Sequence, residues 1–249
     1  MASESPVECI ADVHAVLGEG PVWVAREAAL YWLDIKGRKI FRLGNDGAFT
    51  EWPTPMRVGS IAPRKQGGFI AGTEAGLAKI DLDANRFEVF ANPEKELPTN
   101  RFNDGKVDRQ GRFWAGTMDD QEKQASGTLY RIGSELAVSA ADRGYKVTNG
   151  PAFSPDGMTV DSEACLWIAF WDGWCVRRYS PQGEWLETVK VPVARPTSCS
   201  FGGADLDRLY ITSASIGLDE QAREMQPNAG GLFMLIPGVR GLADVPFAG

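Results

Sequence analysis

Short apolar runs, rich in aromatic and β-branched residues, recur along the chain, and Gly, Asp, Asn and Pro separate them. Runs of this length and composition are typical of β-strands. The five clearest cover residues 29–35, 68–72, 112–116, 165–170 and 208–212. No long amphipathic helix pattern is present, and the best helical candidate, residues 217–225, is short. The pattern predicts an all-β protein.

These aromatic runs belong to a longer repeat. Each unit begins with a polar or small residue beside Gly or Ser, passes through a short strand and a turn, and then reaches the aromatic strand. The units begin at Glu19, Gly59, Asp104, Asp156 and Cys199. Third strands are expected over residues 39–43, 77–81, 128–132, 176–179 and 231–235. A period of roughly 40–50 residues, with about four strands in each unit, is the signature of a β-propeller.

A β-sandwich is the alternative fold, since short strands separated by regular turns suit it as well. The recurrent order of head, first strand, turn and aromatic strand favours the propeller. Residues 7–16 have strand character and precede the first unit. We expect them to pair with the last unit, which would join the two ends of the repeat and cover a strand edge. The sequence therefore predicts a single β-propeller domain over residues 1–249.

Charge and composition exclude several classes of partner. The formal net charge is -7, and an acidic surface argues against nucleic acid or anionic membrane as the main partner. No apolar run approaches the roughly 20 residues that a membrane span requires. The first residues also lack the basic and apolar segments of a secretory signal. We therefore expect a cytoplasmic protein that acts on a small molecule, with no nucleic-acid or membrane partner.

Cysteine and histidine are scarce. The four cysteines, Cys9, Cys165, Cys175 and Cys199, form no CxxC pair, and we interpret them as reduced, half-buried strand residues. The single histidine, His14, is interpreted as a strand residue near the start. A zinc site of His or Cys type has too few candidates, and a Ser-His-Asp triad would have to use His14.

Polar residues stand at the heads of the first strands. In a propeller these strands line the central channel, so their heads gather at one mouth. The heads include Glu19, Asn103 or Asp104, Asn149 and Asp156. Carboxylate and amide oxygens suit a divalent cation such as calcium, magnesium, manganese or zinc. Each residue alone also fits an ordinary turn, because Asp-Gly and Asn-Gly are common turn dipeptides. Their convergence favours a metal site.

Arg101 lies two residues before Asn103, and alternate residues of a strand share a face. Both side chains are then placed to hydrogen-bond a polyhydroxylated ligand or its carbonyl. From spacing alone, a surface arginine beside an Asn-Asp-Gly turn is an equally good interpretation.

Several motifs occur in a fixed order, at residues 17–23 (LGEGPVW), 30–35 (LYWLDI), 101–108 (RFNDGKVD), 111–118 (GRFWAGTM), 148–157 (TNGPAFSPDG) and 161–167 (DSEACLW). Together they resemble the SMP-30/gluconolactonase/regucalcin family of sugar lactonases, and the match continues to about residue 235. The resemblance implies a six-bladed propeller with one divalent metal ion in its channel: calcium, zinc, magnesium, manganese or iron(II). It also implies hydrolysis of a sugar lactone, of gluconolactone or xylonolactone type, to the aldonic acid.

Matching positions suggest the roles of individual residues. The resemblance implies that Glu19, Asn149 and Asp156 bind the metal, which would polarise the lactone carbonyl. Asp156 would be the catalytic general base for the attacking water. Arg101 and Asn103 would bind the substrate and orient its ring.

The segment between Asn149 and Asp156 departs from the family pattern. Relatives have a longer insert there, and about 45 residues, close to one propeller period, are absent from this chain. Five units are therefore legible where the family has six. Alternative functions are a degenerate propeller that binds metal without turnover, a hydrolase of another lactone or ester, and a scaffold that uses the propeller rim. Asp119 and Asp120 follow the GTM motif, where acidic residues of relatives can touch substrate, and we give them little weight.

Overall fold

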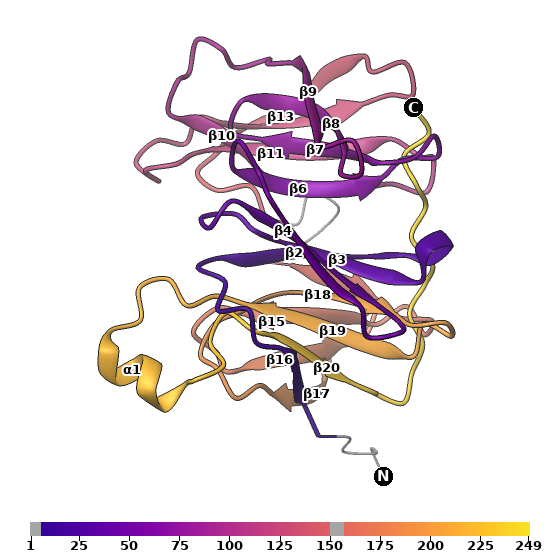
Figure 1. Ribbon diagram of the computed structural model, residues 1–249, viewed down its shortest axis with the longest axis vertical. Helices are drawn as coiled ribbons and strands as arrows, with labels where there is room; N and C mark the ends of the chain where they lie inside the picture. Colours follow the sequence, from indigo (N-terminus) through magenta and orange to yellow (C-terminus); the bar gives the residue numbers. More distant parts are fainter. Residues whose placement is uncertain (1–5, 150–156) are drawn as a thin grey trace. The chain divides into compact units, whose positions relative to one another are not determined.

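The computed structural model describes residues 6–149 and 157–249. Within them the regular secondary structure is almost entirely β, in five four-stranded antiparallel sheets (Figure 1). The described helices are one 3-10 turn, Ala25–Glu27, and one short α-helix, α1 (Glu220–Met225). The all-β prediction is confirmed, and the helix covers the last six residues of the expected segment 217–225.

Two compact units make up the chain. Unit 1 comprises Met1–Glu51 and Pro155–Ala243, and unit 2 comprises Trp52–Ser154 and Asp244–Gly249. The division falls inside β5 (Phe49–Pro53). The single domain over residues 1–249 stays a prediction.

Unit 1 contains three sheets. The first holds β2 (Gly18–Val24), β3 (Ala29–Asp34), β4 (Lys39–Gly44) and β5. The second holds β14 (Met158–Val160), β15 (Leu166–Phe170), β16 (Cys175–Tyr179) and β17 (Trp185–Lys190). The third holds β18 (Pro196–Gly202), β19 (Arg208–Ser213), β20 (Leu232–Leu235) and β1 (Glu8–Ala11). Aromatic runs form the second strand of each sheet, as predicted.

The N-terminal strand joins the last sheet of the repeat. β1 pairs antiparallel with β20, and Cys9 lies opposite Phe233. This confirms the prediction that residues 7–16 add a strand there, although the strand itself is limited to Glu8–Ala11. His14 lies beyond it, in a connection, with a φ of 50° and an exposed side chain. The interpretation of His14 as a strand residue is therefore wrong.

Aromatic side chains hold the sheets of unit 1 together. The Trp167 ring, fully buried, meets Phe201 of β18 edge-on, with ring centroids 6.2 Å apart. Trp23 of β2 stacks on Tyr210 of β19 at 6.3 Å. Burial of rings of this size is the largest single source of stability in such a core. The β18 sheet thus packs between the other two sheets of unit 1.

Aspartates organise equivalent turns in the two units. In unit 1, Asp161 is fully buried and accepts hydrogen bonds from the backbone N–H groups of Glu163 and Cys165 and from the indole of Trp167. In unit 2, Asp108 accepts from the backbone of Gln110 and Arg112 and from the indole of Trp114. Burial alone would raise the pKa of Asp108, but hydrogen bonds from Trp114 and Arg112 outweigh it and lower the pKa to about 2.

Unit 2 contains two sheets. One holds β6 (Val58–Pro63), β7 (Phe69–Thr73), β8 (Gly76–Asp81) and β9 (Arg86–Ala91). The other holds β10 (Asn100–Val107), β11 (Phe113–Asp119), β12 (Gly127–Ile132) and β13 (Val138–Tyr145). The C-terminal segment completes the core between them, because the ring of Phe247 is fully buried there. The backbone N–H of Phe247 donates to the carbonyl of Pro63, and its carbonyl accepts from the N–H of Lys65.

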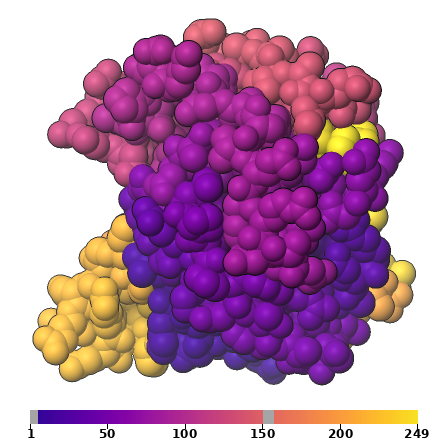
Figure 2. Space-filling model, turned by 45° about the horizontal axis from the view of Figure 1, so that its top comes forward, coloured from indigo at the N-terminus to yellow at the C-terminus, as the bar shows by residue number. Residues whose placement is uncertain are grey.

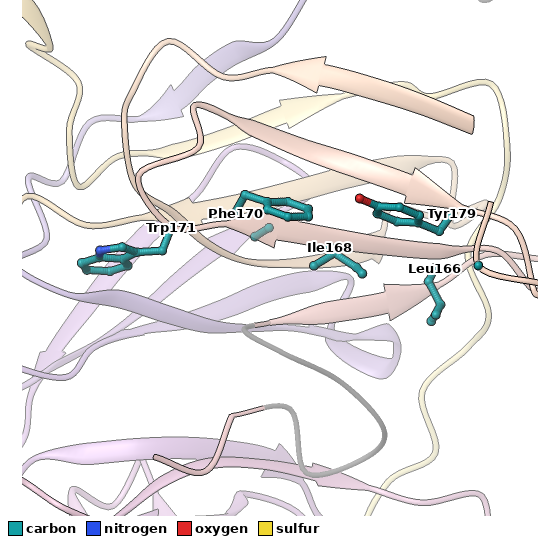
Figure 3. Close-up of a pocket in the computed structure, with 7 residues that line it drawn as sticks. Leu166, Ile168, Phe170, Trp171 and Tyr179 are labelled. Carbon is teal, nitrogen blue, oxygen red and sulfur yellow. The ribbon is translucent and has the colours of Figure 1, made fainter. Parts of the chain in front are cut away.

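One face of the β14 sheet is hollowed and mainly apolar, and Arg177 stacks there on the ring of Phe170. Trp167 and Val176 point to the opposite face, into the core. The hollowed face has a pocket of about 420 Å³. Its lining includes Leu166, Ile168, Phe170, Trp171 and Tyr179 (Figure 3). These side chains offer neither a carboxylate nor an amide, so the pocket does not fit a metal-dependent site.

The segment around α1 projects from unit 1 and is seen in gold at the lower left of Figure 2. Its N-cap, Asp219, accepts a hydrogen bond from the N–H of Ala222.

Three of the four free cysteines are buried rather than half-buried, and Cys9 is the exception. In the part of the chain that the structure describes, no helix has the length and apolar character needed to cross a membrane.

Candidate functional site

A β-bulge in β10 presents the central residue of the site. Pairing between β10 and β11 slips between Phe102 and Gly105, so Asn103 falls at an irregular position. Bulges turn a side chain away from the regular alternation and are frequent beside active sites. Arg101, just before the bulge, is only 6% exposed.

Gly59 of β6 allows the two sheets to meet closely at this bulge. A Cβ atom on Gly59 would stand 2.4 Å from the carbonyl oxygen of Asn103 and 2.5 Å from that of Phe102. Both separations are below any real Cβ contact, so a side chain at this position would push β10 away. The backbone of β10 at Asn103 therefore rests directly on the backbone of β6.

Three predicted site residues form one hydrogen-bonded group. Nη1 of Arg101 donates to Oδ1 of Asn103 at 2.8 Å. Nδ2 of Asn103 donates to Oδ1 of Asn149 at 2.8 Å and to the carbonyl oxygen of Thr148 at 2.9 Å. The predicted shared face of Arg101 and Asn103 is thus expressed as a direct contact between their side chains. Asn149 lies just after β13, so the group connects the first strand of this sheet, β10, to the segment that follows its last strand.

Asp120 connects Arg101 to a second arginine. Oδ1 of Asp120 accepts from Nε of Arg101 at 2.7 Å, and Oδ2 accepts from Nη1 of Arg57 at 2.8 Å. Nε of Arg57 donates to Glu74 at 2.5 Å. Arg57 precedes β6 and Glu74 follows β7, so the ion pairs link the β6 sheet to the β10 sheet.

The electrostatics keep Asp120 ionised. Partial burial would raise its pKa, but the hydrogen bonds from Arg57 and Arg101 outweigh burial and hold that pKa well below its usual range. The neighbouring Asp119 has a different partner set, since it accepts from the backbone N–H groups of Lys123 and Gln124. Asp119 therefore shapes the turn after β11, whereas Asp120 pairs with Arg101 and Arg57.

Glu19 stands at a second bulge, in unit 1. Pairing between β2 and β3 slips between Glu19 and Val22, and Gly20 takes a positive φ of 54°. Gly at this place permits the left-handed turn that redirects the strand. Oε2 of the half-buried Glu19 accepts from the N–H of Gly20 at 3.1 Å. A carboxylate at the head of a first strand is thus presented by a bulge, as Asn103 is in unit 2.

Comparison with known proteins gives the family. The model of the SMP-30/Gluconolactonase/LRE-like region matches residues 17–157 and 154–215. The chain is similar to regucalcin of Xenopus laevis, with 31% identity over 99% of this chain and 100% of the relative. It is also similar to 6-deoxy-6-sulfogluconolactonase of Pseudomonas putida, with 32% identity over 98% of this chain and 99% of the relative. The chain belongs to the SMP-30/gluconolactonase family.

Solved structures agree with this family on the fold. The calcium-binding protein regucalcin of Agrobacterium tumefaciens has a TM-score of 0.91 at 23% identity, covering 98% of this chain and 97% of that chain. A luciferin-regenerating enzyme has a TM-score of 0.89 at 27% identity, covering 98% and 99%. The five sheets are blades of a β-propeller, and the predicted fold class is confirmed.

The comparisons also bear on the short segment between Asn149 and Asp156. The two matched stretches overlap at residues 154–157, the Ser-Pro-Asp-Gly motif, so this single motif aligns twice. The alignment with the Xenopus protein runs over 300 residues, against 249 in this chain. The excess is close to one propeller repeat of roughly 40–50 residues. Both findings agree with the absence of about one family repeat.

The structure brings together only part of the predicted site. Arg101, Asn103 and Asn149 contact one another in unit 2. Glu19 belongs to unit 1, and Asp156 lies outside the described residues. Metal binding by Glu19, Asn149 and Asp156 therefore stays a prediction.

Arg57 and Glu74 were not among the predicted site residues, and Asp120, which was given little weight as a substrate contact, forms an ion pair with Arg101. A signal for Arg57 was available. It directly precedes β6, the first strand of the second sequence repeat, and lies at the same end of the strand as the other head residues. Glu74 follows an ordinary second strand and offers no comparable signal.

Proposed function

We propose that this chain is a lactonase that hydrolyses a sugar lactone, of gluconolactone or xylonolactone type, to the aldonic acid with the help of one divalent cation. The observation that supports this most directly is the hydrogen-bonded group of Arg101, Asn103 and Asn149. This group places the guanidinium of Arg101 and two oriented side-chain amides at the strand heads, where the family motifs lie. The similarity to a sulfogluconolactonase over nearly the full length supports the same reaction class.

The donor set fits a hard divalent cation. Glu19 supplies a carboxylate and Asn149 an amide oxygen, and the proposed third ligand is the Asp156 carboxylate. Among residues 6–149 and 157–249, no three His, Cys, Asp or Glu side chains gather as a metal site. Of the proposed ligands, only Glu19 is both an acid and within those ranges. The absence of such a group there therefore does not test the proposed ligand set. The similarity to a calcium-binding regucalcin supports a divalent ion.

The residues of the chain have separate tasks in this reaction. A cation bound by these oxygens would supply Lewis-acid polarisation of the lactone carbonyl. Asp156 would take the proton of the attacking water and pass it to the ring oxygen that leaves. The guanidinium of Arg101, which is almost fully buried, would border the ring and stabilise negative charge that develops on it.

A hydrolysis assay tests the proposal. The protein is stripped with a chelator and assayed on gluconolactone and xylonolactone, alone and with magnesium, calcium, manganese, zinc or iron(II). We expect hydrolysis above the spontaneous rate only with a cation, and its loss in Glu19→Gln and Asp156→Asn. Glu163→Gln, on an exposed carboxylate outside the site, is the control. The proposal fails if no cation raises the rate on either lactone.

A non-catalytic metal-binding propeller is the second candidate. The doubly aligned Ser-Pro-Asp-Gly motif favours it, because about one repeat of the family is absent beside the proposed base. Cation binding that Glu19→Gln removes, with no turnover of either lactone and no effect of Asp156→Asn, would identify this second function.

A further inference from the structure

A continuous chain of hydrogen bonds leads from the edge of the β6 sheet to Asn149. Its successive members are Arg57, Asp120, Arg101, Asn103 and Asn149. All five belong to unit 2. Arg101 is nearly closed to solvent at 6% exposed, whereas the side chain of Asp120 is only partly buried, at 27% exposed.

Asp120 has both carboxylate oxygens committed to arginines. Nε of Arg101 donates to Oδ1, and Nη1 of Arg57 donates to Oδ2. Arg57 is itself held, since Glu74 accepts both its Nε–H and its backbone N–H. A carboxylate bound on both oxygens by fixed donors has one orientation. Asp120 therefore holds the guanidinium of Arg101 in one orientation.

Asn103 has its whole amide group committed as well. Its Oδ1 accepts from Arg101, and its two amide hydrogens go to Oδ1 of Asn149 and to the carbonyl of Thr148. The arginine contact fixes which end of the amide is oxygen, so the NH₂ end faces Asn149. Oδ1 of Asn149 is then held in one direction, with a second lone pair left for another partner.

We propose that Arg57 and Asp120 are positioning residues that act through Arg101 and Asn103 to aim the side-chain oxygen of Asn149 at the bound cation. This inference rests on the proposed function for the identity of the ligand atom. It assigns to Asn103 an orienting task, because its two amide hydrogens bond Asn149 and Thr148. Outer hydrogen bonds of this kind orient metal ligands and are worth about 10–100-fold in metal affinity.

The backbone supports the same arrangement. Gly59 lets β6 touch β10 at Asn103, and the bulge after Phe102 turns the Asn103 side chain toward Asn149. Arg57 is the residue before β6 and is thus carried by the strand on which the bulge rests. Sheet packing and the hydrogen-bond chain therefore fix one geometry.

The decisive experiment follows the side-chain amide signals of Asn103 and Asn149 by NMR in the metal-free protein. The signals are assigned by their loss in Asn103→Asp and Asn149→Asp. We expect both sets to shift in Arg57→Met and in Asp120→Asn, and to return toward their natural positions in Arg57→Lys. Arg112→Met is the matched control, because it breaks another arginine–aspartate pair of unit 2, with Asp108. It should leave both sets unchanged.

A titration with manganese(II) gives the second readout. We expect Arg57→Met and Asp120→Asn to weaken binding by about 10-fold or more, while Arg112→Met binds like the natural protein. Unshifted amide signals in both variants overturn the inference, whatever the metal result. Shifted signals without any manganese binding by the natural protein would refute the proposed metal site and with it the aim of Asn149. Shifted signals with unchanged manganese affinity would also overturn the inference, while the lactonase assay could still succeed.

Discussion

Replacing Asp161 by Asn tests how the turn before β15 is stabilised. Oδ1 of Asp161 accepts from the N–H groups of Glu163 and Cys165, both at 2.9 Å. Oδ2 accepts from the Trp167 indole at 3.0 Å and from Nε of Arg178 at 2.8 Å. An asparagine has the same shape, and its amide oxygen can keep the two backbone bonds. Its NH₂ group then faces two donors that cannot accept.

The expected loss follows from the burial of the pair. Asp161 is fully buried and the Arg178 side chain is 13% exposed, and removing one partner of a buried ion pair costs about 3–5 kcal/mol. Arg178 keeps a second carboxylate, that of Glu163, at 2.6 Å. Because Glu163 is 62% exposed, its pairing compensates by only about 0.2–1 kcal/mol. The net loss should therefore lie near the lower end, about 3 kcal/mol.

Urea unfolding measures the loss as a lower midpoint with an unchanged slope. Asp108→Asn is the matched control, since the same turn in unit 2 leaves its aspartate 22% exposed, and it should cost about 1–2 kcal/mol. Glu163→Gln should stay within about 0.5 kcal/mol. The reasoning is refuted if Asp161→Asn costs no more than Glu163→Gln, because the buried carboxylate would then contribute nothing net.

Three further predictions concern the described residues. Phe247→Ala should lower stability by about 3–5 kcal/mol, since the fully buried ring leaves a cavity in unit 2; an unchanged thermal midpoint would contradict this. Gly59→Ala should cost about 1–3 kcal/mol and shift the Asn103 amide signals, because its Cβ would collide with β10; unshifted signals would show that β10 need not move. Asp108, with a pKa of about 2 against an ordinary 3.8, stabilises the fold above about pH 4 and loses this effect as the pH falls through about 2. The stability gap between the natural protein and Asp108→Asn should therefore narrow on acidification, and a constant gap would count against the assignment.

The sheets were predictable because each strand has a local signature. Residues 29–35 and 208–212, for example, are nearly continuous apolar runs with aromatic residues that the structure buries in β3 and β19. The head residues Glu19 and Asn103 were also predictable, since each interrupts its strand with a polar residue beside Gly or Asp-Gly. Neither bulge was predicted, because a bulge depends on the partner strand as well as on its own residues.

The ion pairs behind the site were beyond local reasoning. Arg57 and Asp120 are far apart in the sequence and meet only because the β6 and β10 sheets pack together. A charged residue before a strand is ordinary by itself, and only the packed sheets show which carboxylates it pairs with. The interpretation of His14 as a strand residue failed because the local sequence does not show where the first strand ends. That strand stops at Ala11, and His14 follows in a connection.

The pairing of β1 with β20 has a consequence for synthesis. β1 leaves the ribosome before every other described strand, whereas β20 leaves after all of them. The third sheet of unit 1 therefore cannot be completed during translation until the strands between them have been made. Until then β1 has no β20 to pair with, and strand pairings this distant in sequence form slowly. Chains stalled on the ribosome short of Leu235 would expose strand edges that the finished protein covers, which makes them natural clients for chaperones.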